Sequence, residues 1–181
     1  MVITITGLPG SGKSTIAKLL SEQLNISWYS MGDLRGKMAR ERNMTIDELN
    51  SLGETESFTD NEVDEYQTQL GNSGQSFVID GRLSWYFIPN SFKVFLNVNN
   101  EIGSQRIFDS ANEGKRSDEK HYTSSLEVQQ VIERRIQSDI KRYKQYYGID
   151  FMDPKQFDLV IDTSNKTTQE VLQEILSHIP S

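Results

Sequence analysis

The sequence predicts a three-layer α/β fold in which a five-stranded parallel sheet carries helices on both faces. Three observations lead to this prediction. The chain has five short apolar runs, the stretches between them place apolar residues mostly at helical spacing, and no repeat or linker divides the 181 residues. Strands of parallel sheets are buried on both faces and therefore form short apolar runs between helices. With 35% apolar residues, the chain is large enough for one domain with its own core.

Composition narrows the chemistry further. The chain has 26 acidic and 19 basic residues and a formal net charge of -7, which disfavours broad electrostatic binding of nucleic acid or of an anionic membrane. It has no cysteine, which excludes disulfides and thiol catalysis and fits a reducing cytosol. No apolar run approaches the roughly 20 residues of a membrane helix, and the N-terminus lacks the basic start of a signal peptide. We therefore expect a cytoplasmic monomer that acts on small molecules and has no nucleic-acid or membrane partner.

The first half of the chain begins with a predicted strand, loop and helix. Residues 2–6 alternate apolar side chains with threonine, and residues 14–24 carry apolar residues at helical spacing. A second strand is expected at residues 26–29. Thr45 and Glu48 form a capping-box pattern at the start of a helix. The polar stretch that contains this pattern is predicted to form helices at about 34–43, 45–52 and 60–71.

The second half continues the alternation. Residues 77–79 and 93–98 are apolar, rich in β-formers and preceded by turn residues, so we predict buried strands. Residues 109–125 are charged and contain few apolar side chains, which predicts a mobile lid containing Lys115 and Arg116 as candidate phosphate contacts. The remaining predicted elements are helices at 100–108, 126–147 (ended by Gly148) and 168–178, and a fifth strand at 157–161.

These elements define one domain over residues 1–181. We expect its core to comprise residues 1–31, 75–108 and 126–181. Residues 32–74 form a helical insert, and residues 109–125 form the short lid. The insert and the lid are elaborations of one core, because no linker separates them from it.

A glycine-rich loop follows the first predicted strand. Residues 7–14 match the pattern Gly-x-x-x-x-Gly-Lys-Ser and lead directly into a helix, which is the context that a phosphate-binding P-loop requires. Its glycines allow backbone N–H groups to surround an anion at the positive end of the helix. Lys13 can reach the β- and γ-phosphates of ATP, and Ser14 can ligate Mg²⁺. The alternative is a glycine turn that binds nothing. The predicted ATP-binding residues here are Gly7, Pro9, Gly10, Ser11, Gly12, Lys13, Ser14 and Thr15.

A carboxylate ends the third predicted strand. Asp80 is followed by Gly81 and Arg82. If this strand lies next to the first strand of the sheet, Asp80 stands beside the P-loop and can hold Mg²⁺ together with Ser14. The alternative is an ordinary Asp-Gly turn.

The long helix at 126–147 carries a second candidate site. Arg135, Asp139 and Arg142 are spaced i, i+4 and i+7, so they share one face of the helix. Two guanidinium groups can neutralise a transferred phosphoryl group, and a carboxylate between them can accept a hydrogen bond from a sugar hydroxyl. The alternative is a solvated helix face held by salt bridges.

Several segments of the sequence are similar to those of cytidylate kinases, and nearest to those of the short archaeal (d)CMP kinases, over almost the whole chain. They are residues 5–15, 30–33, 38–42, 80–83, 141–144 and 147–150. The resemblance implies a P-loop NTPase fold and transfer of the γ-phosphoryl group of ATP to CMP or dCMP with Mg²⁺, which gives CDP or dCDP and ADP. It also implies that residues 32–74 form a monophosphate-binding (NMP-binding) insert.

The resemblance also implies roles for single residues. It implies that Arg82 and Arg135 hold the acceptor phosphate, that Arg142 contacts phosphates during transfer, that Asp139 lies near the acceptor sugar and that Arg106 lies on the ATP side. The residues predicted to act in catalysis are Lys13, Arg135 and Arg142. Those predicted to bind the acceptor are Asp33, Arg35, Asp80, Gly81, Arg82, Arg135, Asp139 and Arg142.

Some positions depart from the family pattern. Gly36 replaces an arginine, and Arg35 stands one place early, which on a helix is a rotation of about 100°. Glu65 and Tyr66 replace a basic pair, and Leu83 replaces the acid of the bacterial enzymes. The departures fall where the base is expected to be read. AMP, UMP or a small metabolite is therefore the alternative acceptor, and a non-catalytic NTP-binding regulatory module is the alternative of another class.

Overall fold

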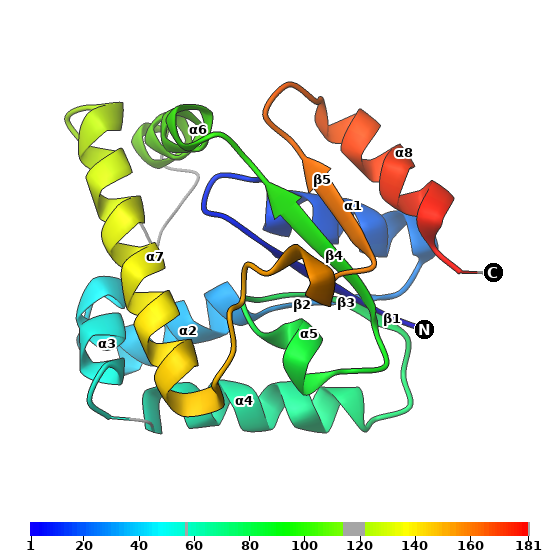
Figure 1. The fold of residues 1–181 in the computed structure, drawn as a ribbon, viewed down its shortest axis with the longest axis horizontal. Coiled ribbons are helices and arrows are strands. Elements are labelled where there is room, and N and C mark those ends of the chain that lie inside the picture. Colours follow the sequence, from blue (N-terminus) through cyan, green and yellow to red (C-terminus); the bar gives the residue numbers. More distant parts are fainter. Residues whose placement is uncertain (57, 114–121, 181) are drawn as a thin grey trace.

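The computed structural model describes residues 1–56, 58–113 and 122–180. Five parallel strands form one sheet in the order β2-β3-β1-β4-β5 (Figure 1). The strands are β1 (Val2–Gly7), β2 (Ser27–Ser30), β3 (Phe77–Asp80), β4 (Phe92–Asn97) and β5 (Leu159–Asp162). The predicted α/β class and the parallel five-stranded sheet are confirmed.

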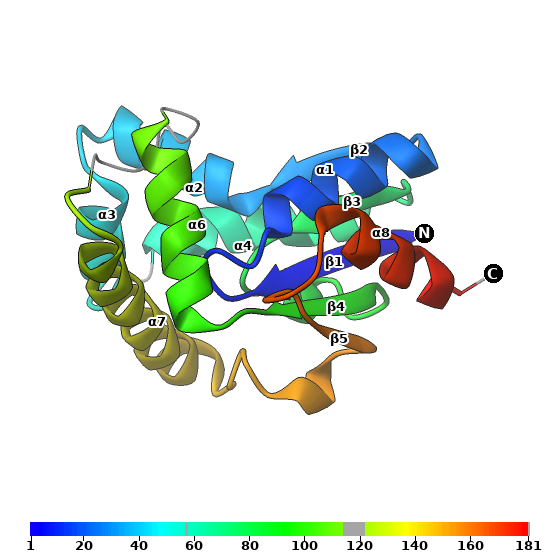
Figure 2. The same ribbon diagram turned by 90° about the horizontal axis from the view of Figure 1, so that it is seen from above.

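Helices cover both faces of this sheet (Figure 2). On one face α1 and α8 pack against Ile5, Val78 and Leu96, and on the other α2 and α4 pack against Phe77 and Ile79. No helix in the described part of the chain is long and apolar enough to span a membrane. The helices are α1 (Lys13–Leu24), α2 (Met31–Glu41), α3 (Ile46–Gly53), α4 (Phe58–Gly71), α5 (Ser84–Phe87), α6 (Asn100–Asn112), α7 (Ser125–Tyr147) and α8 (Thr168–His178).

The predicted capping box at the start of α3 is present. The Thr45 side chain accepts from the Glu48 backbone N–H at 3.2 Å, and the Glu48 carboxylate accepts from the Thr45 N–H at 2.7 Å. In contrast, α2 begins three residues earlier than expected. Ser30 caps it by accepting from the Asp33 N–H at 3.3 Å, so the chain enters this helix directly from β2. Helices α2, α3 and α4 follow one another in residues 31–71.

The predicted lid is too long at its N-terminal end. Helix α6 extends to Asn112, because Ile107 and Ala111 lie one turn apart and are buried against Val128 and Ile132 of α7. Residues 109–112 are therefore helical and packed. The Asn112 side chain also bonds both the N–H and the carbonyl of Tyr122, each at 3.2 Å. The two lid candidates Lys115 and Arg116 lie outside the described residues.

The last predicted strand begins two residues too early. A 3₁₀ turn (Pro154–Gln156) precedes it, and Asp153 caps this turn by accepting from the Lys155 N–H at 3.0 Å. The Phe157 ring packs 4.9 Å from the Phe95 ring, measured between centroids. Strand pairing starts only after Asp158, whose carboxylate accepts from the Lys93 N–H at 2.8 Å.

Candidate active site

The P-loop connects β1 to α1 and is shaped by its glycines. Gly10 has a φ of 78°, and a Cβ atom there would lie 2.3 Å from the carbonyl oxygen of Gly103 in α6, so no other residue fits. Gly12 has a φ of 89° and precedes the first turn of α1. The Lys13 ammonium group donates to the Leu8 carbonyl at 2.9 Å. The Lys13 side chain therefore folds back over the P-loop, where it is predicted to contact a bound phosphate.

Asp80 lies beside the P-loop, as expected if β1 and β3 are neighbours. These strands pair with Ile5 opposite Asp80, and the Ser14 hydroxyl donates to Asp80 Oδ2 at 2.9 Å. Trp28 Nε1 donates to the other carboxylate oxygen at 2.7 Å. Burial raises the pKa of Asp80 above its ordinary value, whereas the bonds from Trp28 and Ser14 and the charge of Lys13 oppose this rise. The Asp80 carboxylate is thus buried between donors at the end of the sheet.

This pair of side chains suits Mg²⁺. A carboxylate and a hydroxyl in contact are hard oxygen ligands of the kind that Mg²⁺ prefers, and Mg²⁺ usually takes only one or two protein ligands beside phosphate oxygens and water. Within the described residues there is no group of three or more His, Cys, Asp or Glu side chains that could enclose a metal ion. The chemistry of Ser14 and Asp80 therefore fits a metal that arrives with a nucleotide.

A buried ion-pair cluster lies next to this pair. Arg82 Nε donates to Asp139 Oδ2 at 2.8 Å, and Arg142 Nη2 donates to Asp139 Oδ1 at 2.5 Å. Arg142 Nη1 also contacts both oxygens of Asp60 at 2.6 Å, and the arginine side chain is only 1% exposed. Burial alone would raise the pKa of Asp139, but Arg82 and Arg142 together hold it below its ordinary value. Asp139 is therefore a fixed carboxylate.

Arg35 joins this cluster from α2. Its Nη1 donates to Asp60 Oδ1 at 2.9 Å and its Nε to Asn50 Oδ1 at 2.8 Å. Two buried donors, Arg35 Nη2 and Arg142 Nε, have no acceptor among the described residues. A buried donor without an acceptor costs about 1–3 kcal/mol. Both arginines line the same cavity.

The P-loop and the arginine cluster open into one cavity of about 480 Å³. This volume lies in the range of small-molecule sites. Among the predicted site residues, those that line the cavity are Pro9, Gly10, Lys13, Ser14, Thr15, Asp33, Arg35, Asp80, Gly81, Arg82, Arg135, Asp139 and Arg142.

Four predicted residues do not line the cavity. Gly7, Ser11 and Gly12 belong to the P-loop itself. Arg106 lies behind the loop, where it donates to the carbonyl of Thr163 at 2.9 Å and to that of Gly10 at 3.4 Å. Arg106 therefore links the P-loop to the segment after β5.

Three polar residues of α4 line the cavity but were not singled out from the sequence. Asp60, Asp64 and Gln67 are spaced i, i+4 and i+7, the same spacing that identified the face of residues 135, 139 and 142. This periodicity could have found them. Glu65 and Tyr66, at positions expected to read a base, are exposed and do not line the cavity.

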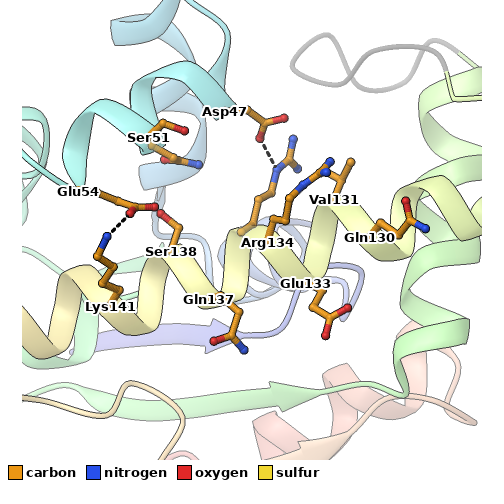
Figure 3. A pocket seen from close by; sticks show the side chains of 12 residues that line it. Asp47, Ser51, Glu54, Gln130, Val131, Glu133, Arg134, Gln137, Ser138 and Lys141 are labelled. Carbon is orange, nitrogen blue, oxygen red and sulfur yellow. Dashed lines mark hydrogen bonds and ion pairs between the residues drawn. The ribbon is translucent and has the colours of Figure 1, made fainter.

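A second, more open cavity of about 870 Å³ lies between α3 and α7 (Figure 3). Two ion pairs bridge these helices: Arg135 Nε donates to Asp47 Oδ1 at 2.8 Å, and Lys141 Nζ to Glu54 Oε2 at 2.5 Å. Arg135 lines both cavities. Arg135, a predicted acceptor-binding residue on α7, is therefore linked through Asp47 to α3 on the opposite side of the second cavity.

The parallel sheet, the glycine loop between β1 and α1, and the carboxylate at the end of β3 together define a P-loop kinase fold. The solved structure of a shikimate kinase from Aquifex aeolicus supports this fold. It superposes with a TM-score of 0.58 at 21% identity and covers 98% of this chain and 95% of the other.

The chain belongs to the cytidylate kinase-like family, whose model matches residues 2–165. It is 34% identical over 176 residues to a cytidylate kinase of Methanococcoides burtonii, with 97% of this chain and 94% of the relative covered. It is also 40% identical over 177 residues to an S-adenosylmethionine-dependent nucleotide dehydratase of Lacinutrix mariniflava. That match covers 97% of this chain, which spans only 35% of the length of the dehydratase.

Proposed function

We propose that this protein is an ATP-dependent nucleoside monophosphate kinase that phosphorylates CMP or dCMP. The observation that carries the proposal is the single cavity that joins the P-loop to a second cationic group. A P-loop alone accounts for one triphosphate. Four arginines of the same cavity, two of them with buried donors that lack an acceptor among the described residues, provide for a second phosphate: Arg35, Arg82, Arg135 and Arg142.

The residues act by positioning and by neutralising charge. The P-loop N–H groups and Lys13 hold the β- and γ-phosphates of ATP, and Ser14 and Asp80 would hold Mg²⁺, which supplies further charge neutralisation when it is bound. A phosphate oxygen of the acceptor is already an anionic nucleophile and needs no protein base. The arginines hold the acceptor in line with the γ-phosphorus atom, so most of the rate enhancement comes from orientation and electrostatics.

Asp139 is suited to bind the acceptor sugar. Its lowered pKa keeps it ionised at neutral pH, and its two guanidinium partners fix its orientation. A carboxylate held in this way can accept a hydrogen bond from a ribose or deoxyribose hydroxyl. The cytidylate kinase relatives support cytosine as the base. The dehydratase relative is named for a nucleotide, which favours a nucleotide over other small acceptors.

An acceptor screen tests the proposal. ADP release is measured with ATP, Mg²⁺ and, in separate reactions, CMP, dCMP, UMP, AMP or shikimate, and each product is identified by chromatography. We expect CDP and dCDP as the main products. A different phosphorylated product would replace the base assignment. Hydrolysis of ATP that no acceptor stimulates would instead favour the regulatory NTP-binding module.

Replacing Asp47 with asparagine should improve acceptor binding. Asp47 forms an ion pair with Arg135 and would thus compete with the acceptor phosphate for this guanidinium. Because the Asp47 side chain is 53% exposed, its ion pair is worth only about 0.2–1 kcal/mol. We expect the KM for CMP to fall by up to about fivefold with kcat almost unchanged.

Steady-state kinetics at constant ionic strength measures this effect. Glu41→Gln is the matched control, because it removes one charge from an exposed ion pair on α2 that does not involve the cavity. A higher KM in Asp47→Asn would show that Asp47 positions Arg135 for the acceptor instead of competing with it.

A further inference from the structure

Two polar residues of α4 that line the acceptor cavity, Asp64 and Gln67, bond to neighbouring side chains. Asp64 and Gln67 follow Asp60 on the same face of α4. The Tyr147 hydroxyl of α7 donates to Asp64 Oδ2, and Gln67 Nε2 lies 3.5 Å from Asp64 Oδ1. The Ser84 hydroxyl donates to Gln67 Oε1 at 2.6 Å.

These bonds fix which atoms remain for a ligand. Because Ser84 occupies the carbonyl oxygen of Gln67, the amide N–H group of Gln67 is the donor that remains at the cavity. Ionised Asp64 has more lone pairs than its two protein donors use. Asp64 and Gln67 therefore present a hydrogen-bond acceptor and a hydrogen-bond donor side by side at the cavity.

Asp64 and Gln67 lie where the base of an acceptor is expected if its phosphate binds the arginine cluster. Asp60 is occupied by Arg35 and Arg142, and Asp64 stands one helical turn, about 6 Å, farther along α4. Tyr147 likewise lies beyond Arg142 on α7, on the side away from Arg135. Three apolar side chains that line the cavity can contact the faces of a flat ring: Ile46, Val63 and Leu83.

We propose that Asp64 and Gln67 read the hydrogen-bonding edge of the acceptor base and select bases that carry an exocyclic amino group, such as cytosine, over uracil. This inference rests on the proposed kinase function and assigns the base-reading residues of that site. Cytosine presents an amino donor beside the N3 acceptor, which is complementary to a carboxylate beside an amide N–H. Uracil presents the O4 acceptor beside the N3–H donor, so both contacts become repulsive.

The ionisation of Asp64 makes this selection sensitive to pH. Burial raises the pKa of Asp64 to about 6, and the charge of Asp60 on the same helix raises it as well. The Tyr147 bond from α7 and the charges of Arg35 on α2 and Arg142 on α7 oppose that rise. Above pH 6 Asp64 is an acceptor for the cytosine amino group. Below pH 6 the neutral acid carries an O–H donor that fits uracil O4.

The test is the ratio of kcat/KM for CMP to kcat/KM for UMP between pH 5 and pH 8. The ratio cancels the titration of groups that both reactions share, such as the acceptor phosphate and ATP. For the wild-type protein we expect the ratio to fall by about tenfold from pH 8 to pH 5, which corresponds to one hydrogen bond. In Asp64→Asn the ratio at pH 8 should be at least about tenfold lower and independent of pH.

Glu62→Gln is the matched control, because it removes the same charge from an exposed residue of α4 that does not line the cavity, and it should leave both the ratio and its pH profile unchanged. Tyr147→Phe removes the hydroxyl that lowers the pKa of Asp64, so the midpoint of the ratio should move to higher pH. That shift identifies Tyr147 as a positioning residue, because a merely structural role would not move the midpoint.

Retention of the wild-type ratio and pH slope in Asp64→Asn would overturn the assignment. If Asp64→Asn does not fold, a wild-type ratio that is flat between pH 5 and pH 8 would also overturn it. If the wild-type protein phosphorylates neither CMP nor UMP, the proposed function fails. Calorimetric binding of CMP and UMP without ATP then tests the base selection by itself, with the same variants and the same expected order.

Discussion

Replacement of Lys13 with alanine is expected to reduce kcat/KM for CMP by about 10³-fold or more, because the ammonium group neutralises charge that develops on the transferred phosphoryl group. The fold should be preserved. The side chain makes a hydrogen bond to the Leu8 carbonyl, which is worth about 1 kcal/mol. A continuous assay of ADP release, together with thermal unfolding of the same sample, separates the two effects.

Lys18→Ala is the control for this variant. Lys18 is exposed on the same helix, α1, and does not line the cavity, so its loss changes the net charge of the protein in the same way. We expect wild-type kinetics. Turnover of Lys13→Ala within tenfold of the wild type would contradict the phosphoryl-transfer mechanism.

Replacement of Arg142 with methionine is expected to destabilise the protein by about 3–5 kcal/mol, since it leaves Asp60 and Asp139 buried without this partner. For a chain of this size, that loss lowers the melting temperature by about 10 °C. Urea unfolding measures the free energy, and calorimetry measures the temperature. The methionine keeps most of the buried volume, so the loss reports on charge more than on packing.

Lys144→Met is the matched control on the same helix. Lys144 is exposed, and its substitution should change the unfolding free energy by less than about 0.5 kcal/mol. An Arg142→Met protein as stable as the wild type would contradict this expectation, because it would mean that Asp60 and Asp139 tolerate burial without Arg142.

Local patterns account for what the sequence predicts well. The P-loop, the capping box of Thr45 and the shared face of residues 135, 139 and 142 each depend on residues close in the chain. The position of Asp80 also follows from the rule that neighbouring parallel strands end at the same edge of the sheet.

Contacts between distant elements could not be predicted in this way. Asp60 and Arg142 are 82 residues apart, and only the tertiary fold brings α4 and α7 close enough for their ion pair. On a helix, the side chains of positions 35 and 36 point about 100° apart. This angle alone does not predict which of the two positions faces the cavity. Arg35 in fact lines the cavity, whereas Gly36 is buried against Ile46. Likewise, the position at which α6 ends depends on the packing of Ala111 against α7, which the local sequence does not reveal.

The ion-pair cluster has an unbalanced charge count. In the described part of the chain, Arg35, Arg82 and Arg142 form ion pairs with Asp60 and Asp139, so these pairs join three positive groups to two negative ones. A nucleotide monophosphate carries between one and two negative charges at neutral pH and would make this buried group close to neutral. Acceptor binding and folding are then thermodynamically linked, since a ligand that binds only the native state at 100 times its Kd adds about 2.7 kcal/mol to the unfolding free energy. The protein should thus resist unfolding most when its acceptor is abundant.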